Sequence, residues 1–330
     1  MKMKKVSAIL LASVMAFGMM GCGSSDTTST ADSTAASSAA ASTADSTAAG
    51  STAASTTEAA TSGASATTDY SSLSGAITGS GSSALFPLAQ DAAEEFKKLA
   101  PNVSVTFNAG GSGTGLKQVS DGTVDIGNSD VPAEEKLDAS KAGELVDHKV
   151  CVVSMAPVVN KDITDAGLTS LSKDDLVKVF TGEVTNWKDV GGPDEEITLV
   201  TRPTSSGTRA LFKEYALDGK EEASNSALET DDSGTLLQTI KDTNGSVGYV
   251  ALPYLVGNSD VSTLSIDDVE PTLENTYSGK WNVWGYEHMY TKGEADGAVK
   301  AYLDFITSAD YDEKLESLGY GVTSKMQVER

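Results

Sequence analysis

Basic residues are scarce in this 330-residue chain. It has 24 Lys and Arg against 47 Asp and Glu, which gives a formal net charge of −23 at pH 7. Proteins that bind nucleic acid draw much of their affinity from basic side chains that neutralise phosphates. We therefore expect no nucleic-acid partner for this chain.

Cysteine and histidine are equally rare, with two of each: Cys22, Cys151, His148 and His288. Two cysteines cannot form a framework of several disulfides, and these four residues do not have the spacing of a Cys/His zinc cluster. We therefore expect no metal site and no cofactor. Cys151 falls in an apolar run, where a buried cysteine needs no chemical role.

Motifs for catalysis are missing as well. The chain has no G-x-x-x-x-G-K-[ST] loop and no G-x-S-x-G elbow, and no motif pairs either histidine with a serine. Residues 79–84 fit the dinucleotide pattern G-x-G-x-x-A, but the next expected strand ends Phe107-Asn108-Ala109, without the acid that would bind a ribose. The chain is not expected to be an enzyme.

The first 70 residues have the character of a leader and a tether. Residues 1–21 have three lysines, an apolar run and small residues, as in a signal peptide. Met19-Met20-Gly21-Cys22 resembles the bacterial lipobox, although Met19 replaces the usual leucine, and this resemblance implies lipidation (palmitate) at Cys22. The alternative is a secreted protein with a free Cys22. Residues 22–70 are almost entirely Ser, Thr and Ala, and we expect a disordered tether.

From residue 71 onward, short apolar runs alternate with helical periodicity, which predicts an α/β fold with a largely parallel sheet. About 260 residues are enough for one large domain or two small ones. Two long extended runs, 150–160 and 281–290, are candidates for strands that cross between two lobes. We expect the other strands at 73–78, 103–107, 124–127, 197–202 and 246–251, and helices at 84–99, 116–120, 171–180, 208–217, 235–241 and 295–307.

Three turns of glycine, serine and threonine lie between an expected strand and an expected helix, at 79–83, 110–115 and 205–208. The start of a helix offers unpaired N–H groups and the positive end of the helix dipole, which together favour an anion. Each turn alone could be an ordinary helix cap. Three of them, with Arg202 close to Ser206, favour one shared anion site, because a guanidinium can bind two oxygens at once.

Five segments in order carry a family resemblance: GSSALFPLAQDAAEEF (81–96), GGSGTGLKQVSDGTVDIGNSDVP (110–132), VFTGEVTNWKDVGG (179–192), RPTSSGTRALFKEY (202–215) and GSVGYVALPYL (245–255). They resemble the phosphate-binding lipoproteins of bacterial phosphate ABC transporters. The resemblance implies a type II periplasmic-binding-protein fold, in which two α/β lobes joined by two crossing hinge strands enclose the ligand in a cleft. We expect residues 71–152 plus 286–330 to form lobe 1 and residues 153–285 to form lobe 2.

The resemblance also implies the phosphate-binding residues, which are Ser83, Ala84, Ser112, Asp130, Arg202, Ser206, Gly207 and Thr208. An ionised carboxylate such as Asp130 only accepts hydrogen bonds, so it favours protonated phosphate over sulfate. The alternative for Asp130 is a helix or turn cap before Pro132. Two positions depart from the family pattern: Ala84 replaces a frequent phenylalanine, and Thr204 replaces an acid that would orient Arg202. Arg209 could either add charge to the site or be an exposed helix residue.

The resulting hypothesis is a monomeric, lipid-anchored protein on the extracytoplasmic face of a bacterial cell membrane. It captures inorganic phosphate and delivers it to the permease of an ABC importer. One alternative is a binder of another oxyanion such as sulfate, molybdate or tungstate, which offer no proton at neutral pH. Others are a phosphate-ester hydrolase or phosphotransferase that uses the same cradle, and a surface-interaction protein built on this scaffold.

Overall fold

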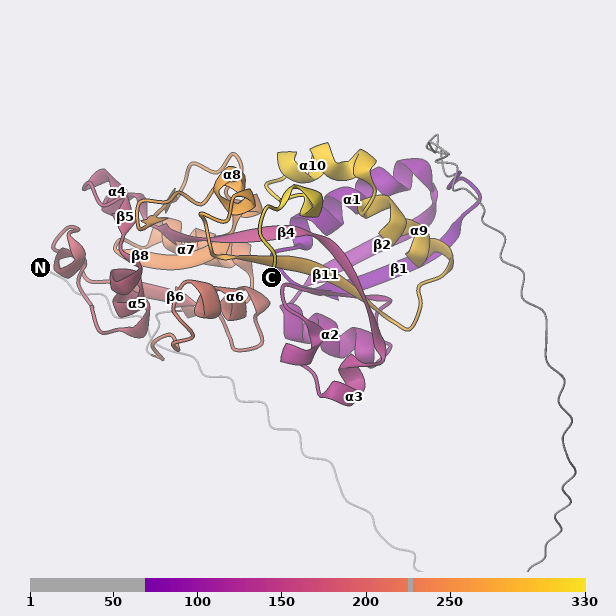
Figure 1. The fold of residues 1–330 in the computed structure, drawn as a ribbon, viewed down its shortest axis with the longest axis horizontal. Helices are drawn as coiled ribbons and strands as arrows, with labels where there is room; N and C mark the ends of the chain where they lie inside the picture. Colours follow the sequence, from indigo (N-terminus) through magenta and orange to yellow (C-terminus); the bar gives the residue numbers. More distant parts are fainter. Residues whose placement is uncertain (1–68, 225–227) are drawn as a thin grey trace, which may run out of the picture. The chain divides into compact units, whose positions relative to one another are not determined.

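Two long strands lie at the centre of one mixed β-sheet and run from one end of the fold to the other (Figure 1). The computed structural model describes residues 69–224 and 228–330. The predicted signal peptide, the predicted lipidation site Cys22 and the predicted tether up to residue 68 therefore lie outside the described residues.

Across the sheet the order of the strands is β2-β1-β3-β11-β4-β8-β6-β7, and β9 pairs with β4 beside this path. Two further strands, β5 and β10, pair parallel to each other in a separate sheet. The strands are β1 (Ser74–Gly81), β2 (Asn102–Ala109), β3 (Ile126–Ser129), β4 (Leu145–Val159), β5 (Ser170–Leu171), β6 (Thr198–Thr201), β7 (Leu228–Glu229), β8 (Ser246–Ala251), β9 (Ser262–Thr263), β10 (Ser265–Ile266) and β11 (Trp284–Lys292).

The α-helices are α1 (Phe86–Leu99), α2 (Ser112–Ser120), α3 (Ala139–Ala142), α4 (Lys161–Asp165), α5 (Lys173–Thr181), α6 (Gly207–Tyr215), α7 (Ser233–Asp242), α8 (Leu273–Tyr277), α9 (Gly297–Ile306) and α10 (Asp312–Ser317). Short 3₁₀ helices lie at Ala133–Glu135, Trp187–Val190, Leu252–Tyr254, Ala309–Tyr311 and Thr323–Lys325.

Two groups of elements lie at opposite ends of the central strands (Figure 1). In the first lobe, β1 pairs parallel to β2 and β3, with α1, α9 and α10 on one side of these strands and α2 on the other. In the second lobe, β6 pairs parallel to β7 and β8, and this lobe also contains α5, α6 and α7. The chain enters the second lobe through β4 and leaves it through β11, so the first lobe is discontinuous in sequence.

The strand β4 changes its partner midway. Its residues 145–154 pair antiparallel with β11, and residues 155–159 pair antiparallel with β8. Every residue from Val150 to Val159 is buried, as expected for a strand that is covered on both faces. The prediction of an extended segment at 150–160 is therefore confirmed by β4, which pairs with strands of both lobes.

The second crossing strand begins three residues later than predicted, at Trp284 rather than at Trp281. The reason is that Trp281 is a buried core residue. Its indole N–H lies 3.2 Å from the carbonyl oxygen of Met155 and 3.1 Å from that of Val283. The chain therefore turns the indole toward these groups before the strand starts, while β11 continues as far as Lys292.

Helix α1 shows how the sequence pattern places the core. Leu88, Ala92 and Phe96 recur at helical spacing and are fully buried, with Phe96 packed edge-on against Tyr302 of α9. Burying a large side chain such as Phe96 contributes about 1.5–3 kcal/mol. The helix was predicted from residue 84 but begins at Phe86, because the Ser82 hydroxyl accepts the N–H of Leu85 and fixes a turn there.

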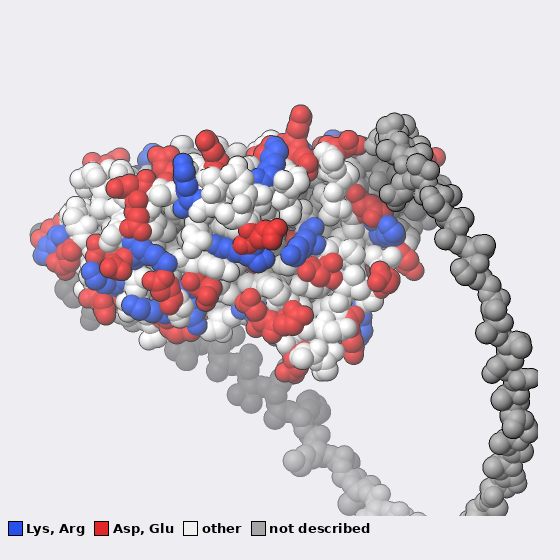
Figure 2. Space-filling view, in the orientation of Figure 1, with Lys and Arg blue, Asp and Glu red and all other residues white. Residues whose placement is uncertain are grey.

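On the visible face, Lys and Arg side chains lie among Asp and Glu side chains (Figure 2). Ion pairs between surface side chains of the described residues include Lys188 with Asp194 and Lys300 with Asp304. None of the helices within residues 69–224 and 228–330 has the length and apolar character that crossing a membrane requires.

Candidate functional site

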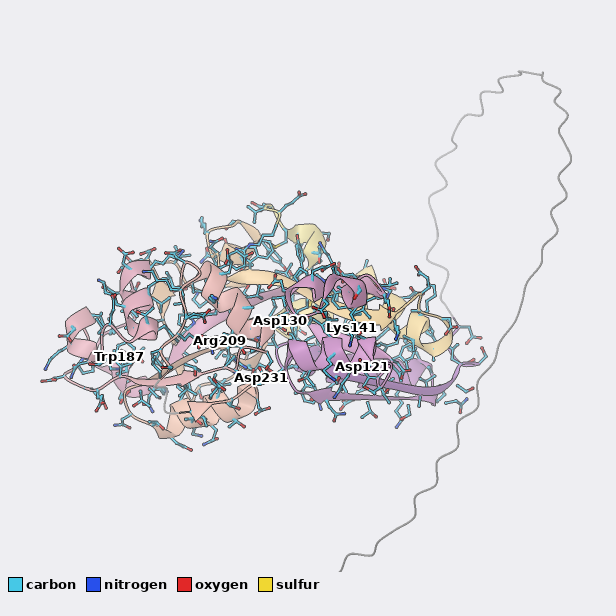
Figure 3. The ribbon with its side chains drawn as sticks, turned by 90° about the horizontal axis from the view of Figure 1, so that it is seen from below. Asp121, Asp130, Lys141, Trp187, Arg209 and Asp231 are labelled. Atoms are coloured by element: carbon cyan, nitrogen blue, oxygen red, sulfur yellow. The ribbon has the colours of Figure 1, made fainter. Side chains whose placement is uncertain are left out.

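All eight residues predicted for the site lie at the junction of the two lobes, and all eight are buried. Four of them, Ser83, Ala84, Ser112 and Asp130, come from the first lobe. The other four, Arg202, Ser206, Gly207 and Thr208, come from the second lobe. Three of the contributing segments are the predicted turns that precede α1, α2 and α6, and the other two are the ends of β3 and β6, which contribute Asp130 and Arg202. In Figure 3, Asp130 is labelled close to Arg209 and Asp231 at this junction, and Trp187 lies far from them.

Asp130 lies directly after β3, and its carboxylate bridges the lobes. The Thr208 hydroxyl donates to Oδ2 of Asp130 at 2.7 Å, and the backbone N–H of Asp130 donates to the Ser112 hydroxyl at 3.0 Å. Oδ1 of Asp130 is buried and has no hydrogen-bond partner among the described residues. The alternative interpretation of Asp130 as a turn cap is wrong, because the following turn is held by Ser129, whose hydroxyl bonds to the backbone of Val131.

Gly207 allows the second lobe to come this close to the first. A Cβ atom at Gly207 would collide with the Ser112 hydroxyl and would lie 2.9 Å from the Cβ of Asp130. Ser206, the residue before it, caps α6 by accepting the N–H of Arg209 at 3.3 Å. The first N–H groups of α6 therefore lie beside Asp130 and Ser112, which is why a side chain at position 207 does not fit.

The first turn brings Ser83 to the same place. Gly81 has φ of +132°, a conformation that side chains rarely allow, and a Cβ there would collide with the backbone of Asn128. The Ser83 hydroxyl lies 3.1 Å from the hydroxyl of Ser233, and the Tyr254 hydroxyl donates to the Ser83 carbonyl at 2.7 Å. The Ala84 carbonyl is occupied by the Tyr320 hydroxyl.

Arg202 is fully buried and is held by neutral acceptors. Its NH2 group donates to the Ser233 hydroxyl at 2.9 Å and to the Tyr249 carbonyl at 3.3 Å, and its NH1 group donates to the Asp231 carbonyl at 3.2 Å. Its Nε is buried and unpartnered among the described residues. In the family pattern an acid at position 204 would orient Arg202. Here that position is Thr204, which is exposed, and Arg202 forms no ion pair with any other described residue.

An aromatic stack fixes the position of the Arg202 guanidinium from behind. The guanidinium carbon lies 5.7 Å from the centre of the Tyr249 ring, and this ring stacks on Phe212 of α6 at 4.1 Å. Arg209 lies behind the site rather than in it, because its NH1 group donates to the Arg202 carbonyl. Its side chain, only 12% exposed, also pairs with the carboxylates of Glu221 and Glu222.

Ser233 is not among the predicted residues, although it contacts both Ser83 and Arg202. A signal was present, because Ser-Gly-Thr occurs at residues 112–114, 206–208 and 233–235, each time at the start of a helix. All three helices, α2, α6 and α7, direct their N-termini to this junction. The third copy follows an acidic pair, Asp231-Asp232, of which Asp232 caps α7.

Lys136 and Tyr254 were also missed, and both join the lobes. The Lys136 ammonium donates to the carbonyls of Thr204 at 3.0 Å and Ser206 at 3.2 Å, and burial lowers its pKa. Burial has the opposite effect on Tyr254, whose neutral form it favours, and raises the pKa of this residue to about 12. A backbone contact between the turns adds to these bonds, because the N–H of Gly113 donates to the Ser205 carbonyl at 3.1 Å.

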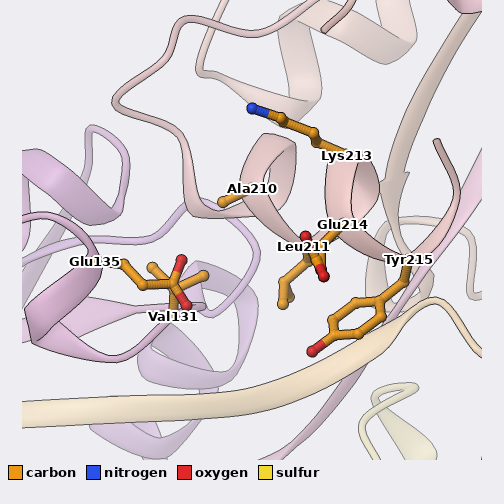
Figure 4. A pocket seen from close by; sticks show the side chains of 7 residues that line it. All are labelled: Val131, Glu135, Ala210, Leu211, Lys213, Glu214 and Tyr215. Carbon is orange, nitrogen blue, oxygen red and sulfur yellow. The ribbon is translucent and has the colours of Figure 1, made fainter. Parts of the chain in front are cut away.

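A separate groove of about 380 Å³ lies next to this junction (Figure 4). It is lined by Val131 and Glu135 of the first lobe and by residues of α6 that include Lys213, Glu214 and Tyr215. Burial raises the pKa of Glu135. With two carboxyl groups and one ammonium group, this groove is less suited to an anion than the junction around Arg202.

The chemistry of the junction therefore suits a small oxyanion. It offers hydroxyls, helix N-termini and the Arg202 guanidinium as donors, and the Asp130 carboxylate as an acceptor. Within residues 69–224 and 228–330, no group of three or more His, Cys, Asp or Glu side chains is arranged to hold a metal ion. Burial raises the pKa of the Cys151 thiol well above its usual value, so this thiol stays protonated.

Comparisons with known proteins agree with this geometry. A family model described as "PBP superfamily domain" matches residues 29–310. The phosphate-binding protein PstS of Bacillus subtilis is 50% identical over 258 residues, which cover 78% of this chain and 84% of that protein. The PstS protein of Borreliella burgdorferi is 25% identical over 251 residues, which cover 73% of this chain and 87% of that protein.

Solved structures show the same fold. A substrate-binding protein from Clostridium perfringens, assigned to phosphate ABC transport and crystallised with bound phosphate, has a TM-score of 0.68 and 27% identity, and the match covers 76% of this chain and all (100%) of that chain. An ABC-type phosphate transport receptor from Vibrio cholerae has a TM-score of 0.59 at 24% identity, covering 74% of this chain and 99% of that chain. The fold is therefore the two-lobed type II periplasmic-binding-protein fold, and the chain belongs to the PBP superfamily and, within it, to the family of the phosphate-binding protein PstS.

Proposed function

We propose that this protein binds inorganic phosphate and serves as the substrate-binding component of an ABC importer. The observation that carries the proposal is that the junction of the lobes buries one charged donor, Arg202, which contacts Ser83 of the first lobe, and one charged acceptor, Asp130, which contacts Thr208 of the second lobe. The relatives named above as phosphate-binding proteins support the choice of ligand.

In this proposal each predicted residue has a distinct role. The buried guanidinium of Arg202 binds two phosphate oxygens, and its unpartnered Nε is available as a further donor. The hydroxyls of Ser83, Ser112, Ser206 and Thr208 and the N–H groups near Ala84 and Gly207 surround the remaining oxygens. The protonated oxygen that phosphate carries near neutral pH donates a hydrogen bond to the Asp130 carboxylate. Sulfate has no such proton, so it leaves Asp130 unpaired and is disfavoured.

Binding also requires that the lobes close over the ligand. The bonds that join the lobes, from Thr208 to Asp130 and from Lys136 to Thr204, support closure as the two-state element. We place the lobe boundaries at residues 71–152 plus 286–330 and residues 153–285. The change of partner along β4, between Ser154 and Met155, supports this division.

The proposal includes the location of the protein. The lipobox-like Met19-Met20-Gly21-Cys22 supports cleavage before Cys22, lipidation there, and anchoring to the extracytoplasmic face of the cell membrane. The tether then gives the binding body reach, which grows with the square root of its length, roughly 5 Å × √n for n residues. The body works as a monomer and presents bound phosphate to the permease.

The test is titration calorimetry of the purified protein, first freed of bound ligand, with phosphate, sulfate and molybdate. We expect phosphate to bind tightest. Arg202→Ala should abolish measurable binding, and Arg202→Lys should remain much weaker than wild type because an ammonium cannot bind two oxygens in a fork. Tight binding of another oxyanion without binding of phosphate contradicts the proposed ligand.

A further inference from the structure

A second carboxyl group, that of Glu287, lies against Asp130 from the crossing strand β11. The sheet places it there: β11 pairs antiparallel with β3, with His288 opposite Ser129. One step along this register, Glu287 of β11 is opposite Asp130. Side chains in such a pair lie on the same face of a sheet, roughly 5 Å apart at Cβ. Glu287 and Asp130 thus face each other at the edge of this strand pair, and both are buried.

Glu287 has no other polar partner in the described part of the chain. Its side chain is fully buried, and both of its carboxyl oxygens lack a donor, as does Oδ1 of Asp130. Two ionised carboxylates cannot satisfy each other, because each of them only accepts hydrogen bonds. A single proton between them solves the problem for both groups, since a neutral carboxyl group can donate to a carboxylate.

The surroundings favour the neutral form of Glu287. Burial raises its pKa well above the usual value, and the nearby Asp130 carboxyl raises it further. The ionisable groups that face Glu287 are Asp130 at the end of β3, Cys151 directly opposite on β4, and Tyr320 after α10. None of these is a cation, and in the described chain neither Glu287 nor Asp130 forms an ion pair.

We propose that Glu287 is a positioning residue for phosphate selection: its neutral carboxyl group donates a hydrogen bond to the Asp130 carboxylate and keeps that carboxylate an acceptor toward the ligand. The inference rests on the proposed function. The pair then has one negative charge rather than two. Without this donor, the Asp130 carboxylate loses the group that keeps it an acceptor toward the ligand, and discrimination against sulfate weakens.

Two substitutions at this position separate positioning from packing. Glu287→Gln keeps the shape and a donor, whereas Glu287→Leu removes the donor. Calorimetry at pH 7 compares phosphate with sulfate. We expect the Gln variant to keep the phosphate-to-sulfate affinity ratio and the Leu variant to lower it roughly tenfold or more, the usual effect of a hydrogen bond to a charged group. Glu294→Gln, which removes an exposed carboxylate just after β11, is the matched control and should change nothing.

The proton itself can be followed in two ways. An infrared difference spectrum of wild type minus Glu287→Gln at pH 6.5 should contain the absorption of a protonated carboxyl group. As the pH rises and Glu287 ionises, the phosphate affinity of wild type should fall relative to that of the Gln variant, because a second negative charge then lies beside the ligand. Phosphate also changes its own protonation over this pH range, but this change affects both proteins equally and cancels in the ratio of their phosphate affinities.

The results that overturn the inference are distinct. If wild type binds phosphate but the Leu and Gln variants keep its selectivity, or lose it to the same extent, Glu287 does not position Asp130. If the Leu variant fails to fold, the infrared measurement decides alone, and absence of the protonated band contradicts the inference. If wild type binds no phosphate, the proposed function fails and this inference fails with it.

Discussion

The hydroxyl of Thr208 lies 2.7 Å from Oδ2 of Asp130, and this bond connects the start of α6 in the second lobe to the end of β3 in the first. Both residues are buried, so the bond joins a neutral donor to a desolvated acceptor. Such a bond forms only when the lobes are together. It therefore couples closure of the protein to the orientation of the carboxylate that we propose to recognise phosphate.

Thr208→Val keeps the size of this side chain and removes the donor. We expect phosphate affinity to fall roughly tenfold or more, because hydrogen bonds to charged groups contribute about 1.5–3 kcal/mol. Calorimetry measures the change. Thr239→Val is the control, since the Thr239 hydroxyl bonds only within α7. An unchanged affinity for Thr208→Val would show that this contact does not stabilise the bound state.

Asp130→Asn tests selectivity more directly. An amide can donate a hydrogen bond as well as accept one, so it can pair with sulfate, which the carboxylate cannot. We expect the preference for phosphate over sulfate to fall, because sulfate gains a donor at this position. The ratio of the two affinities is the measurement, and Asp121→Asn, at an exposed carboxylate in the first lobe, is the control. If the ratio stays at its wild-type value, Asp130 has no part in selecting the ligand.

Gly207→Ala tests the close approach of the lobes. The added methyl group would collide with Ser112 and crowd Asp130, so the closed state should be lost while each lobe stays folded. We expect severely weakened phosphate binding with little change in melting temperature of the ligand-free protein. Gly234→Ala is a closely matched control, because it lies in the same Ser-Gly-Thr motif and its Cβ would meet only Asp232 at 3.4 Å. Equal affinities for the two variants would contradict the steric argument.

Lys136→Met removes a cation that bonds to two carbonyls across the junction. These bonds do not touch the ligand in our proposal, so the variant should weaken phosphate and sulfate equally. The change should appear mainly as faster dissociation, measured by stopped-flow exchange of labelled phosphate. Lys117→Met is the control, since Lys117 is exposed and, among the described residues, forms an ion pair with Asp121 alone. A change in selectivity instead of dissociation rate would place Lys136 at the ligand.

The sequence predicts much of this arrangement, and the reason is local chemistry. Glycine and serine next to helix starts mark the turns that precede α1, α2 and α6. The apolar run at 150–160 indicates a strand buried on both faces, which β4 is. Helix spacing in 84–99 identifies the buried face of α1, although Ser82 delays its start to Phe86. These features are readable because neighbours in the chain determine them.

Contacts between distant segments could not be predicted in this way. Lys136 meets Thr204 across 68 residues, and Tyr254 meets Ser83 across 171 residues. Glu287 is the clearest case: in the sequence it is one acid among 47, and only the register of β11 against β3 brings it to Asp130. Arg202 is similar, because the neutral groups that replace an ion partner come from β8 and from the start of α7.

The buried Glu287 also predicts how stability depends on pH. Its pKa in the folded protein is raised, so between the unfolded pKa and the folded pKa the native state binds more protons than the unfolded state. Stability therefore falls as pH rises through this window, by about 1.4 kcal/mol for each unit of pKa shift. Glu287→Gln removes this loss. Denaturant titrations of the ligand-free protein from pH 4 to pH 9 should find the Gln variant increasingly more stable than wild type as pH rises, while Glu294→Gln follows wild type. Parallel curves for wild type and Glu287→Gln would mean that Glu287 ionises in the folded protein as readily as in the unfolded chain.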